Sequence, residues 1–401
     1  MNAVKTLIAS EPRARRLLAA HAQSSLGTGA AYVALLLVAF DRFHSPFAVT
    51  AILLCELLPS IALGALLGAA ADRWSRKAIL VAADVLRFGA FAALALVGSF
   101  EATVAFALLA GIGQAAFQPA VMASLPGLVS RERLSAVTGA FGALQEFGYT
   151  AGPVIAAAAF VVVDAPGLLL ANAVTFALSA LLLASIDFGS AAPEAQPSRP
   201  SLLASIADGA RALRANRAAW TVVLSSTAFV CFLGAVNVAE VVLVRETLDG
   251  GPAQYSLVVA AMGLGITAGS LLGARDPDGR HYLTGLLLCG LAFAATAAVP
   301  SWPLALATFA LLGLGNGLAL VSENVLLQRV VPDAIKGRVF GLKSSLISTA
   351  FAVAYFGGGA LVAVAGARPT FAALAAGCLV VWAVARSVLV GAPRNVAPSP
   401  A

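Results

Sequence analysis

Four carboxylates lie inside long apolar runs of the sequence, where a charged side chain is costly. They are Glu56, Glu146, Glu240 and Glu323. An acidic group at the centre of a membrane helix costs about 2.5–3.5 kcal/mol on insertion scales, so such groups usually face a cavity or a partner. Glu146 lies beside Gln145 and one turn before Tyr149. We take Glu146 as the first candidate for a proton- or cation-responsive site, and Glu56 as the second.

The other acidic positions leave more than one interpretation open. Glu240 and Glu323 lie near the ends of their apolar runs, so contact with lipid headgroups explains them as well as a functional site does. Asp84 and Arg87 are three residues apart, a spacing that places them on one helix face. We expect them to form an internal pair at the cytoplasmic end of their helix.

Further polar residues interrupt the apolar runs and are candidates to face a cavity. They are His21, Gln23, Gln114, Gln118, Asn172, Asn237 and Asn316. A single histidine near a helix end is more often structural than a proton carrier, so His21 carries both interpretations.

The composition defines the class of protein. Of 401 residues, 60% are hydrophobic and 11% are charged, less than half the charged share of an average soluble domain. The sequence therefore predicts a polytopic membrane protein. The net charge of +6 then reflects membrane topology and does not indicate nucleic-acid binding. Four cysteines lie singly without CxxC spacing, so we expect neither a disulfide framework nor a metal site.

Apolar runs of about 20 residues predict the membrane-spanning helices. We place them near residues 17–40, 47–71, 78–99, 102–127, 136–162, 168–186, 220–244, 254–274, 282–299, 303–327, 340–365 and 370–391. The fold class is an all-α membrane protein with twelve transmembrane helices.

The distribution of basic residues predicts the orientation. With the N-terminus inside, 25 Lys and Arg residues all fall on the cytoplasmic side except Arg42, Arg245 and Arg368. Basic residues in short loops collect on the cytoplasmic side of a membrane. We therefore expect both termini in the cytoplasm of a cell, with the chain in its inner or plasma membrane.

A hydrophilic segment at 187–219 divides the chain into six predicted spans on either side. Its first part is rich in Pro and Ser and is typical of a linker. Residues 202–219 alternate apolar and basic residues at helical spacing, which predicts an amphipathic segment on the membrane surface. Gly111 and Gly113 align with Gly313 and Gly315 at a constant separation of 202 residues. We expect two pseudo-symmetric six-helix bundles, at 1–186 and 220–401.

Between the second and third predicted spans lies the sequence GALLGAAADRWSRK. Gly64 and Gly68 share one helix face, where they would let another backbone come close. The charged residues that follow are Asp72, Arg73, Arg76 and Lys77. Taken alone, the stretch fits a helix corner anchored to lipid equally well.

With two halves, a central loop and this signature, the chain resembles the major facilitator superfamily over essentially its whole length. In the fifth span, Gly148, Gly152 and Pro153 resemble the motif associated with antiporters and drug exporters, although Ala156 and Ala157 replace its last two glycines. The segment from Glu323 to Arg338 is similar to a branch that includes macrolide and siderophore exporters. Ala107 stands where many proton antiporters carry Arg, so that residue is not available for coupling.

The resemblance implies a role for the segment from Gly64 to Lys77. The second span would meet the eleventh, and Asp72 would lie at that helix's N-terminus only while the cytoplasmic ends of the bundles are closed. Pro153 would bend or soften the fifth span, or form a passive kink.

The function we predict is secondary active export of a hydrophobic or amphipathic small molecule by alternating access, with proton antiport. The chain would act as a monomer in the lipid bilayer, without cofactors or nucleic acid. We find no nucleophile elbow, HExxH or Walker motif, and so expect no enzyme. The alternatives are an importer or facilitator of a small metabolite, and a non-transporting membrane receptor with the same fold.

Overall fold

The computed structural model describes residues 11–188, 210–211, 213–214, 216–274 and 278–389. It describes the backbone but not the side chains of residues 65, 68–73 and 333–334.

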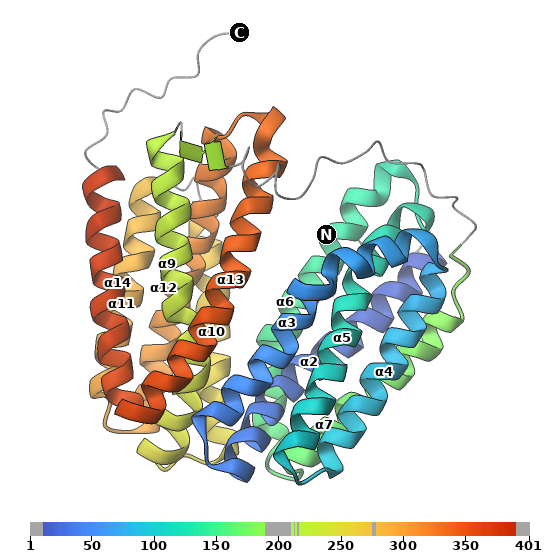
Figure 1. Ribbon diagram of the computed structural model, residues 1–401, viewed down its shortest axis with the longest axis horizontal. Coiled ribbons are helices and arrows are strands. Elements are labelled where there is room, and N and C mark those ends of the chain that lie inside the picture. Colours follow the sequence, from blue (N-terminus) through green and yellow to red (C-terminus); the bar gives the residue numbers. More distant parts are fainter. Residues whose placement is uncertain (1–10, 189–209, 212, 215, 275–277, 390–401) are drawn as a thin grey trace. The chain divides into compact units, whose positions relative to one another are not determined.

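The described residues form twelve long helices (Figure 1), so a helix is present at each of the twelve predicted spans, and eleven of these helices are long and apolar enough to cross a membrane. In the N-terminal half they are α2 (Pro12–Phe43), α3 (Pro46–Arg73), α4 (Arg76–Leu96), α5 (Phe100–Ser124), α6 (Arg131–Ala159) and α7 (Ala165–Ala184). In the C-terminal half they are α9 (Arg217–Val242), α10 (Pro252–Gly273), α11 (Gly279–Ala298), α12 (Trp302–Val330), α13 (Asp333–Ala365) and α14 (Ala367–Leu389). Short helical turns η1 (Leu125–Gly127) and η2 (Leu243–Thr247) extend α5 and α9.

Polar residues at the helix starts explain where several helices begin. The Ser75 hydroxyl accepts a hydrogen bond from the Ala78 amide, and the Asp164 carboxylate accepts one from the Gly167 amide at 2.8 Å. Such caps satisfy amide groups that a helix leaves free at its first turn. Helices α4 and α7 therefore begin directly after the polar residues Ser75 and Asp164.

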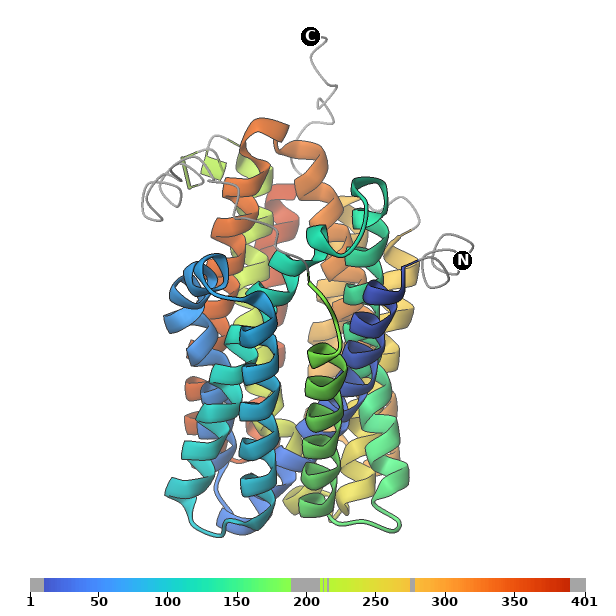
Figure 2. The ribbon, with the colours of Figure 1, turned by 90° about the vertical axis from the view of Figure 1, so that its right-hand side faces the viewer.

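By its internal contacts the chain divides into two compact units. The first comprises residues 1–197, 240–263 and 362–364, and the second comprises residues 198–239, 264–361 and 365–401. In the first unit, α2 packs against α6 and α7, α3 against α5, and α4 against α5 and α7. Figure 2 shows α4, α5 and α7 running side by side.

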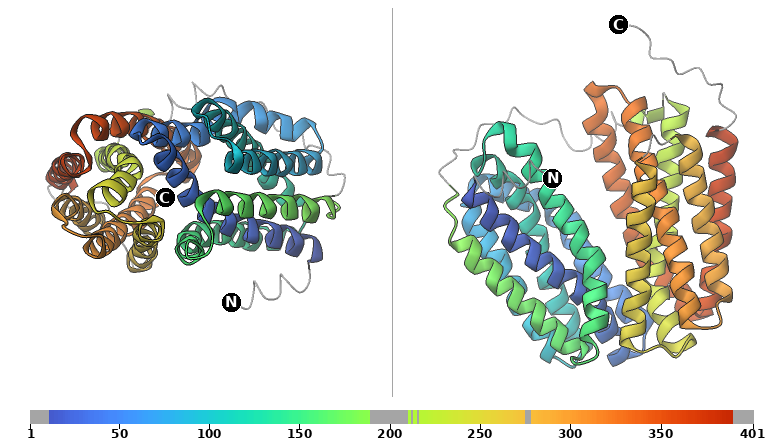
Figure 3. Two further views of the ribbon diagram at one scale, coloured as in Figure 1. Left: turned by 90° about the horizontal axis from the view of Figure 1, so that it is seen from below. Right: turned by 180° about the vertical axis from the view of Figure 1, so that it is seen from behind.

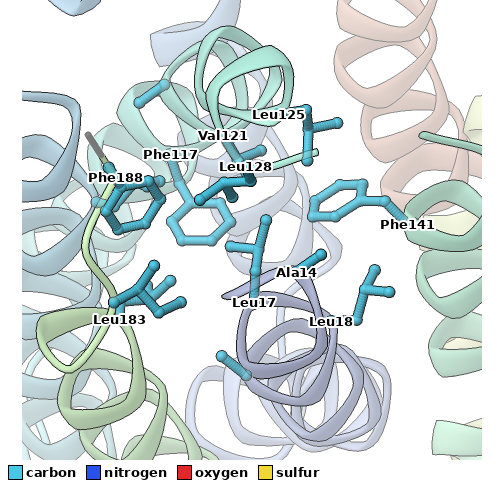
Figure 4. Close-up of a cluster of buried hydrophobic side chains, with 14 of the residues drawn as sticks. Ala14, Leu17, Leu18, Phe117, Val121, Leu125, Leu128, Phe141, Leu183 and Phe188 are labelled. Atoms are coloured by element: carbon cyan, nitrogen blue, oxygen red, sulfur yellow. The ribbon is translucent and has the colours of Figure 1, made fainter. Parts of the chain in front are cut away.

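One core of the N-terminal bundle is purely apolar (Figure 4). It joins Leu17 and Leu18 of α2 to Phe117 and Val121 of α5 and to Phe141 of α6, all of which are buried. This cluster surrounds the first turns of α2. It forms an apolar layer at that end of the bundle.

The C-terminal bundle repeats the packing of the N-terminal one. In the second unit, α11 packs against α12 and α14, as α4 packs against α5 and α7 in the first. The starts of α5, α6 and α7 lie 202 residues before those of α12, α13 and α14, the same separation that relates the paired glycines. The two halves are therefore pseudo-symmetric, and Figure 3 shows their helices from two further sides.

The predicted connector lies largely outside the described residues. Of the predicted amphipathic segment at 202–219, residues 210, 211, 213, 214 and 216–219 are described, Leu213 is buried, and α9 begins at Arg217 within the segment. The domain boundaries at 187 and 219 therefore stay a prediction.

Candidate functional site

Helix α6 differs from the other long helices in how apolar its membrane-length segment is. Among the described residues, eleven helices are long and apolar enough to cross a membrane by length and composition, and α6 is the long helix that does not meet this measure. Gln145, Glu146 and Tyr149 occupy its middle. A helix of this polarity in a membrane bundle needs polar surroundings.

The N-terminal bundle contains a cavity of about 160 Å³, which we call the Glu56 cavity. It is lined by Thr28, Tyr32, Glu56, Arg87, Phe91, Ala110, Gly111, Gln114, Tyr149 and Phe176, which come from all six helices of the bundle. In the part of the chain that the structure describes, Glu56 forms no ion pair. A carboxylate without a cation, on the wall of an interior cavity, can take up a proton or a cationic group.

The two glycines of α5 place the charged residues on this cavity. A Cβ added to Gly111 would strike the carbonyl oxygen of Cys55, the residue before Glu56, so only glycine lets α3 approach α5 at this point. A Cβ added to Gly113 would lie 2.7 Å from the Arg87 Cγ. The Gly111-x-Gly113 sequence thus brings Glu56 close and leaves room for the Arg87 side chain.

Arg87 is held from several sides. It forms an ion pair with Asp84 and donates a hydrogen bond to the Gln114 Oε1 at 2.8 Å. Its guanidinium carbon lies 4.3 Å from the ring centroids of both Phe117 and Phe176. The predicted Asp84–Arg87 pair is therefore present.

The predicted position of that pair was wrong. Asp84 is 0% and Arg87 5% exposed, in the middle of α4 and not at a cytoplasmic helix end. The sequence analysis counted Arg87 among the cations of the cytoplasmic side because its basic character alone cannot separate a topogenic residue from a buried one. Its buried partners make Arg87 part of the bundle interior.

A second, smaller cavity of about 30 Å³ adjoins the first, and we call it the His21 cavity. It is lined by His21, Ser24, Ser25, Thr28, Arg87, Gln114, Phe117, Gln118, Gln145 and Tyr149. Thr28, Arg87, Gln114 and Tyr149 line both cavities. The His21 ring stacks on the Phe141 ring, with centroids 3.6 Å apart.

The structure brings together some of the candidate residues and separates others. Glu56, Gln145 and Tyr149 line the two cavities, whereas Glu146 is exposed and lines neither. We therefore place Glu56 ahead of Glu146. Gln23, expected to face a cavity, instead donates to the Thr175 carbonyl at 2.8 Å and joins α2 to α7.

Glu240 and Glu323 are buried, so headgroup contact does not explain them. Glu240 is 2% exposed and accepts a hydrogen bond from the Tyr255 hydroxyl at 3.1 Å. Glu323 is 4% exposed and pairs with Lys343 of α13 at 2.7 Å. Lys343, which the sequence analysis placed with the cytoplasmic cations, also donates to Asn324 and is itself buried.

The antiporter-like motif forms a close helix crossing. A Cβ added to Gly148 would lie 2.6 Å from the Ser25 carbonyl carbon, and one added to Gly152 would lie 2.5 Å from the Ala30 amide nitrogen. The motif thus lets α6 touch the backbone of α2. Helix α6 continues through Pro153 without a break.

The segment from Gly64 to Lys77 spans the end of α3 and the start of α4. A Cβ added to Gly64 would meet open space, and Arg76 begins α4. The side chains of Gly68, Asp72 and Arg73 lie outside the described residues. The predicted contact of this segment with the eleventh span stays a prediction.

A polar face of α2 lines both cavities. His21, Ser25, Thr28 and Tyr32 follow one another at helical spacing, and each lines one of the two cavities. Gln114 and Gln118 of α5 and Gln145 and Tyr149 of α6 are likewise four residues apart. These spacings were readable in the sequence as three polar stripes.

Two repeated bundles of membrane-length helices, with charged residues buried inside them, are typical of membrane transporters. The family model of the Major Facilitator Superfamily matches residues 17–275 and 236–401. The chain belongs to this superfamily.

Several characterised relatives carry names of efflux proteins. The chain is 27% identical over 378 residues to the protein named multidrug efflux pump Tap of Mycobacterium tuberculosis, which covers 90% of this chain and 89% of the relative. It is 22% identical to macrolide efflux protein A of Streptococcus pyogenes, over 75% of this chain and 77% of the relative.

Solved structures share the fold. The nucleoside transporter NupG superposes with a TM-score of 0.73 at 14% identity and covers 95% of this chain and 99% of its own. A bacterial homologue of the human lysosomal transporter Spinster gives a TM-score of 0.68 at 15% identity, over 97% of this chain and 100% of its own.

Proposed function

We propose that this transporter exports a hydrophobic or amphipathic small molecule by alternating access, in exchange for protons. The observation that carries this proposal is Glu56 on the wall of the Glu56 cavity. Asp84 and Glu323 are each paired with a cation, whereas Glu56 is not, among the described residues. A carboxylate in this state can bind a proton in one step of the cycle and release it in another.

The cavity supports an amphipathic cargo. The rings of Phe91 and Phe176 line it together with Glu56 and Gln114, so apolar and polar groups both find partners there. Its volume of about 160 Å³ is below the roughly 300–1,000 Å³ of drug-sized sites. The N-terminal bundle by itself therefore accommodates one group of a larger molecule. The names of the efflux relatives favour export over import.

The same proposal includes the setting of the protein. We place it as a monomer in the cell membrane. Both termini would lie in the cytoplasm, because basic residues concentrate in the loops of that side. Removing Arg87 and Lys343 from that count leaves the asymmetry in place, since only Arg42, Arg245 and Arg368 fall outside.

The test compares dye accumulation in cells that make the wild-type chain, Glu56→Gln or Glu146→Gln at equal membrane levels. Wild-type cells should hold less ethidium than cells without the protein, and an uncoupler should abolish the difference. Glu56→Gln should behave like cells without the protein, because the amide cannot carry a proton, while Glu146→Gln should retain export.

Three outcomes would contradict the proposal. Higher dye levels in wild-type cells would indicate an importer, and export that survives the uncoupler would exclude proton coupling. Full export by Glu56→Gln would remove Glu56 from the site. Because Gln has nearly the shape of Glu, the folding of the variant can be checked separately by its thermal unfolding in detergent.

A further inference from the structure

The Glu56 cavity and the His21 cavity are two parts of one polar interior. They share Thr28, Arg87, Gln114 and Tyr149, so no helix separates them. The polar face of α2 runs along both, from His21 through Ser25 and Thr28 to Tyr32. We call these lining residues of α2, together with Gln114, Gln118, Gln145 and Tyr149, the polar strip.

The dimensions of the two cavities suit water. A cavity needs about 10–15 Å³ of water-accessible volume and two or more polar partners to hold a water molecule. The His21 cavity, at about 30 Å³, has room for about one or two, and the Glu56 cavity has room for several. Hydroxyl and amide groups along the strip supply the partners.

The two ends of the strip carry side chains that can exchange a proton. At one end Glu56 has no ion pair in the described part of the chain. At the other end His21 is 7% exposed, and the Ser25 hydroxyl oxygen lies 3.4 Å from its Nε2. Histidine is the side chain whose charge changes most readily near neutral pH.

We propose that the polar strip is a proton pathway inside the N-terminal bundle, with His21 and Glu56 as the proton-carrying groups at its two ends. The inference rests on the proton exchange in the proposed function. In the inward step the O–H bond of the protonated Glu56 breaks, the proton passes through water, and an N–H bond forms on the imidazole of His21. The products are a carboxylate and an imidazolium, and the reverse transfer returns the proton.

The charges that face the strip do not block this transfer. Arg87 lies between the two ends, and a lone guanidinium would repel a proton, but Asp84 neutralises it through their ion pair. The other titratable groups that line the strip are Tyr32 of α2 and Tyr149 of α6. The thiol of Cys55, next to Glu56 on α3, donates to the Val104 carbonyl at 3.6 Å. Phe117 of α5 and Phe176 of α7 close the sides with uncharged rings.

The apolar cluster at the first turns of α2 seals the strip beyond His21. Leu17 and Leu18 precede His21 on α2, and Phe141, which stacks on the His21 ring, belongs to the same cluster (Figure 4). An apolar layer next to a proton-carrying group prevents leakage of protons in the absence of cargo.

The first test separates proton transfer from cargo movement in proteoliposomes, with ethidium as the probe and a macrolide as a second one. His21→Gln should lower probe transport driven by a pH gradient by at least about tenfold, because it removes a proton-carrying group. Exchange of probe between the two sides at equal pH needs no net proton movement and should stay at the wild-type rate. His44→Asn, a change at an exposed histidine, is the matched control and should affect neither.

The possible results are decisive. Unchanged gradient-driven transport in His21→Gln would overturn the pathway, and an equal loss of exchange would mean that His21 is structural. If the wild-type protein itself does not respond to the gradient, the proton exchange of the proposed function fails, which is a different result from loss in the variant alone.

A second test needs no cargo. Phe141→Leu should increase the proton leak of empty proteoliposomes, because it opens the apolar layer beside His21, and adding His21→Gln should reverse the increase. A leak that persists in the double variant would overturn the role of His21. No increase in Phe141→Leu would overturn the sealing role of the layer and the closed end of the pathway.

Discussion

Arg87 shows how a charge is kept inside an apolar bundle. Its guanidinium meets the Asp84 carboxylate, the Gln114 amide oxygen and the faces of two phenylalanine rings. Removing two charges from water costs several kcal/mol per ion, and the attraction between them repays this only with further hydrogen bonds and good packing. The four partners supply both.

Removing one member of this pair should destabilise the protein strongly. Asp84→Ala leaves Arg87 buried without a counter-charge, which typically costs about 3–5 kcal/mol. The double change Asp84→Leu with Arg87→Met replaces both charges by apolar groups, so most of the stability should return. The unfolding temperature in detergent measures both effects.

Transport should separate from stability in the same pair of variants. The double variant should fold but not move ethidium in response to a pH gradient, because Arg87 lines both cavities. Wild-type transport by the double variant would mean that the ion pair is only structural. A single variant as stable as the wild type would show that water reaches Arg87.

The sequence identified buried carboxylates but could not rank them. Glu56 and Glu146 both lie in the middle of a membrane helix, and only packing decides which one enters a cavity. Gly111 brings α3 against α5 at Glu56, whereas Glu146 is exposed. Arg87 was misplaced for a related reason, since a basic residue within a dozen positions of a loop looks the same whether it points to lipid or to Asp84.

At the scale of helices, the α2–α6 crossing depends on three glycines. A Cβ on Gly29 would strike the backbone of Gly148, and one on Gly152 would strike the backbone of Gly29 and Ala30. The crossing also sets the polar strip, because Ser25 and Thr28 on α2 and Gln145 and Tyr149 on α6 lie on either side of it. Close packing and polar lining are therefore built by the same two helices.

Gly152→Ala should force α2 and α6 apart. The added methyl group would lie 2.5 Å from the Ala30 amide nitrogen, where backbone atoms cannot give way cheaply. Overpacking of this kind costs typically about 1–3 kcal/mol. We expect a lower unfolding temperature in detergent and reduced gradient-driven transport.

Gly142→Ala on the same helix is the control. A Cβ there meets open space, so the change should stabilise α6 by about 0.5–1 kcal/mol through helix propensity alone. If Gly152→Ala were as stable and as active as Gly142→Ala, the close crossing of α2 and α6 would contribute to neither stability nor transport.

The presence of the helices could be predicted from the sequence, because an apolar run of about 20 residues that crosses a membrane forms a helix in nearly every case. The role of the Gly148–Gly152 motif was not, because a glycine in a sequence does not say which backbone it meets. Pro153 was expected to bend or soften α6, or to form a passive kink. Helix α6 is continuous across Pro153, from Arg131 to Ala159.

At the scale of the whole molecule, the two halves share a framework and differ in polarity. The separation of 202 residues relates Asp84 and Arg87 of α4 to Leu286 and Cys289 of α11, and Phe176 of α7 to Cys378 of α14. These C-terminal residues are buried and uncharged. The repeat was visible in the sequence, but the different positions of the buried charges in the two halves emerged only from the packing.

The C-terminal half has a charged pair of its own at a different place. Glu323 of α12 and Lys343 of α13 are related by the same separation to Val121 and Phe141, both apolar and both in the layer beyond His21. Among the described residues each half thus has a buried ion pair, and the two pairs lie at positions that are not equivalent. The two pseudo-symmetric bundles therefore differ in where their buried charged residues lie.

The contact predicted for Asp72 would be a property of the whole molecule, since it would join the two halves in one conformational state. A carboxylate at a helix N-terminus contributes typically about 0.3–1 kcal/mol, which changes the ratio of two states by about two- to fivefold. Asp72→Asn should therefore raise the labelling rate of a reporter cysteine at Ala143 on α6 by about that factor, in a chain whose own cysteines are replaced. Glu132→Gln at the start of α6 removes an exposed carboxylate elsewhere and should leave the rate unchanged. Equal rates for Asp72→Asn and the wild type would make the segment from Gly64 to Lys77 a lipid anchor, because an anchor acts on both states alike.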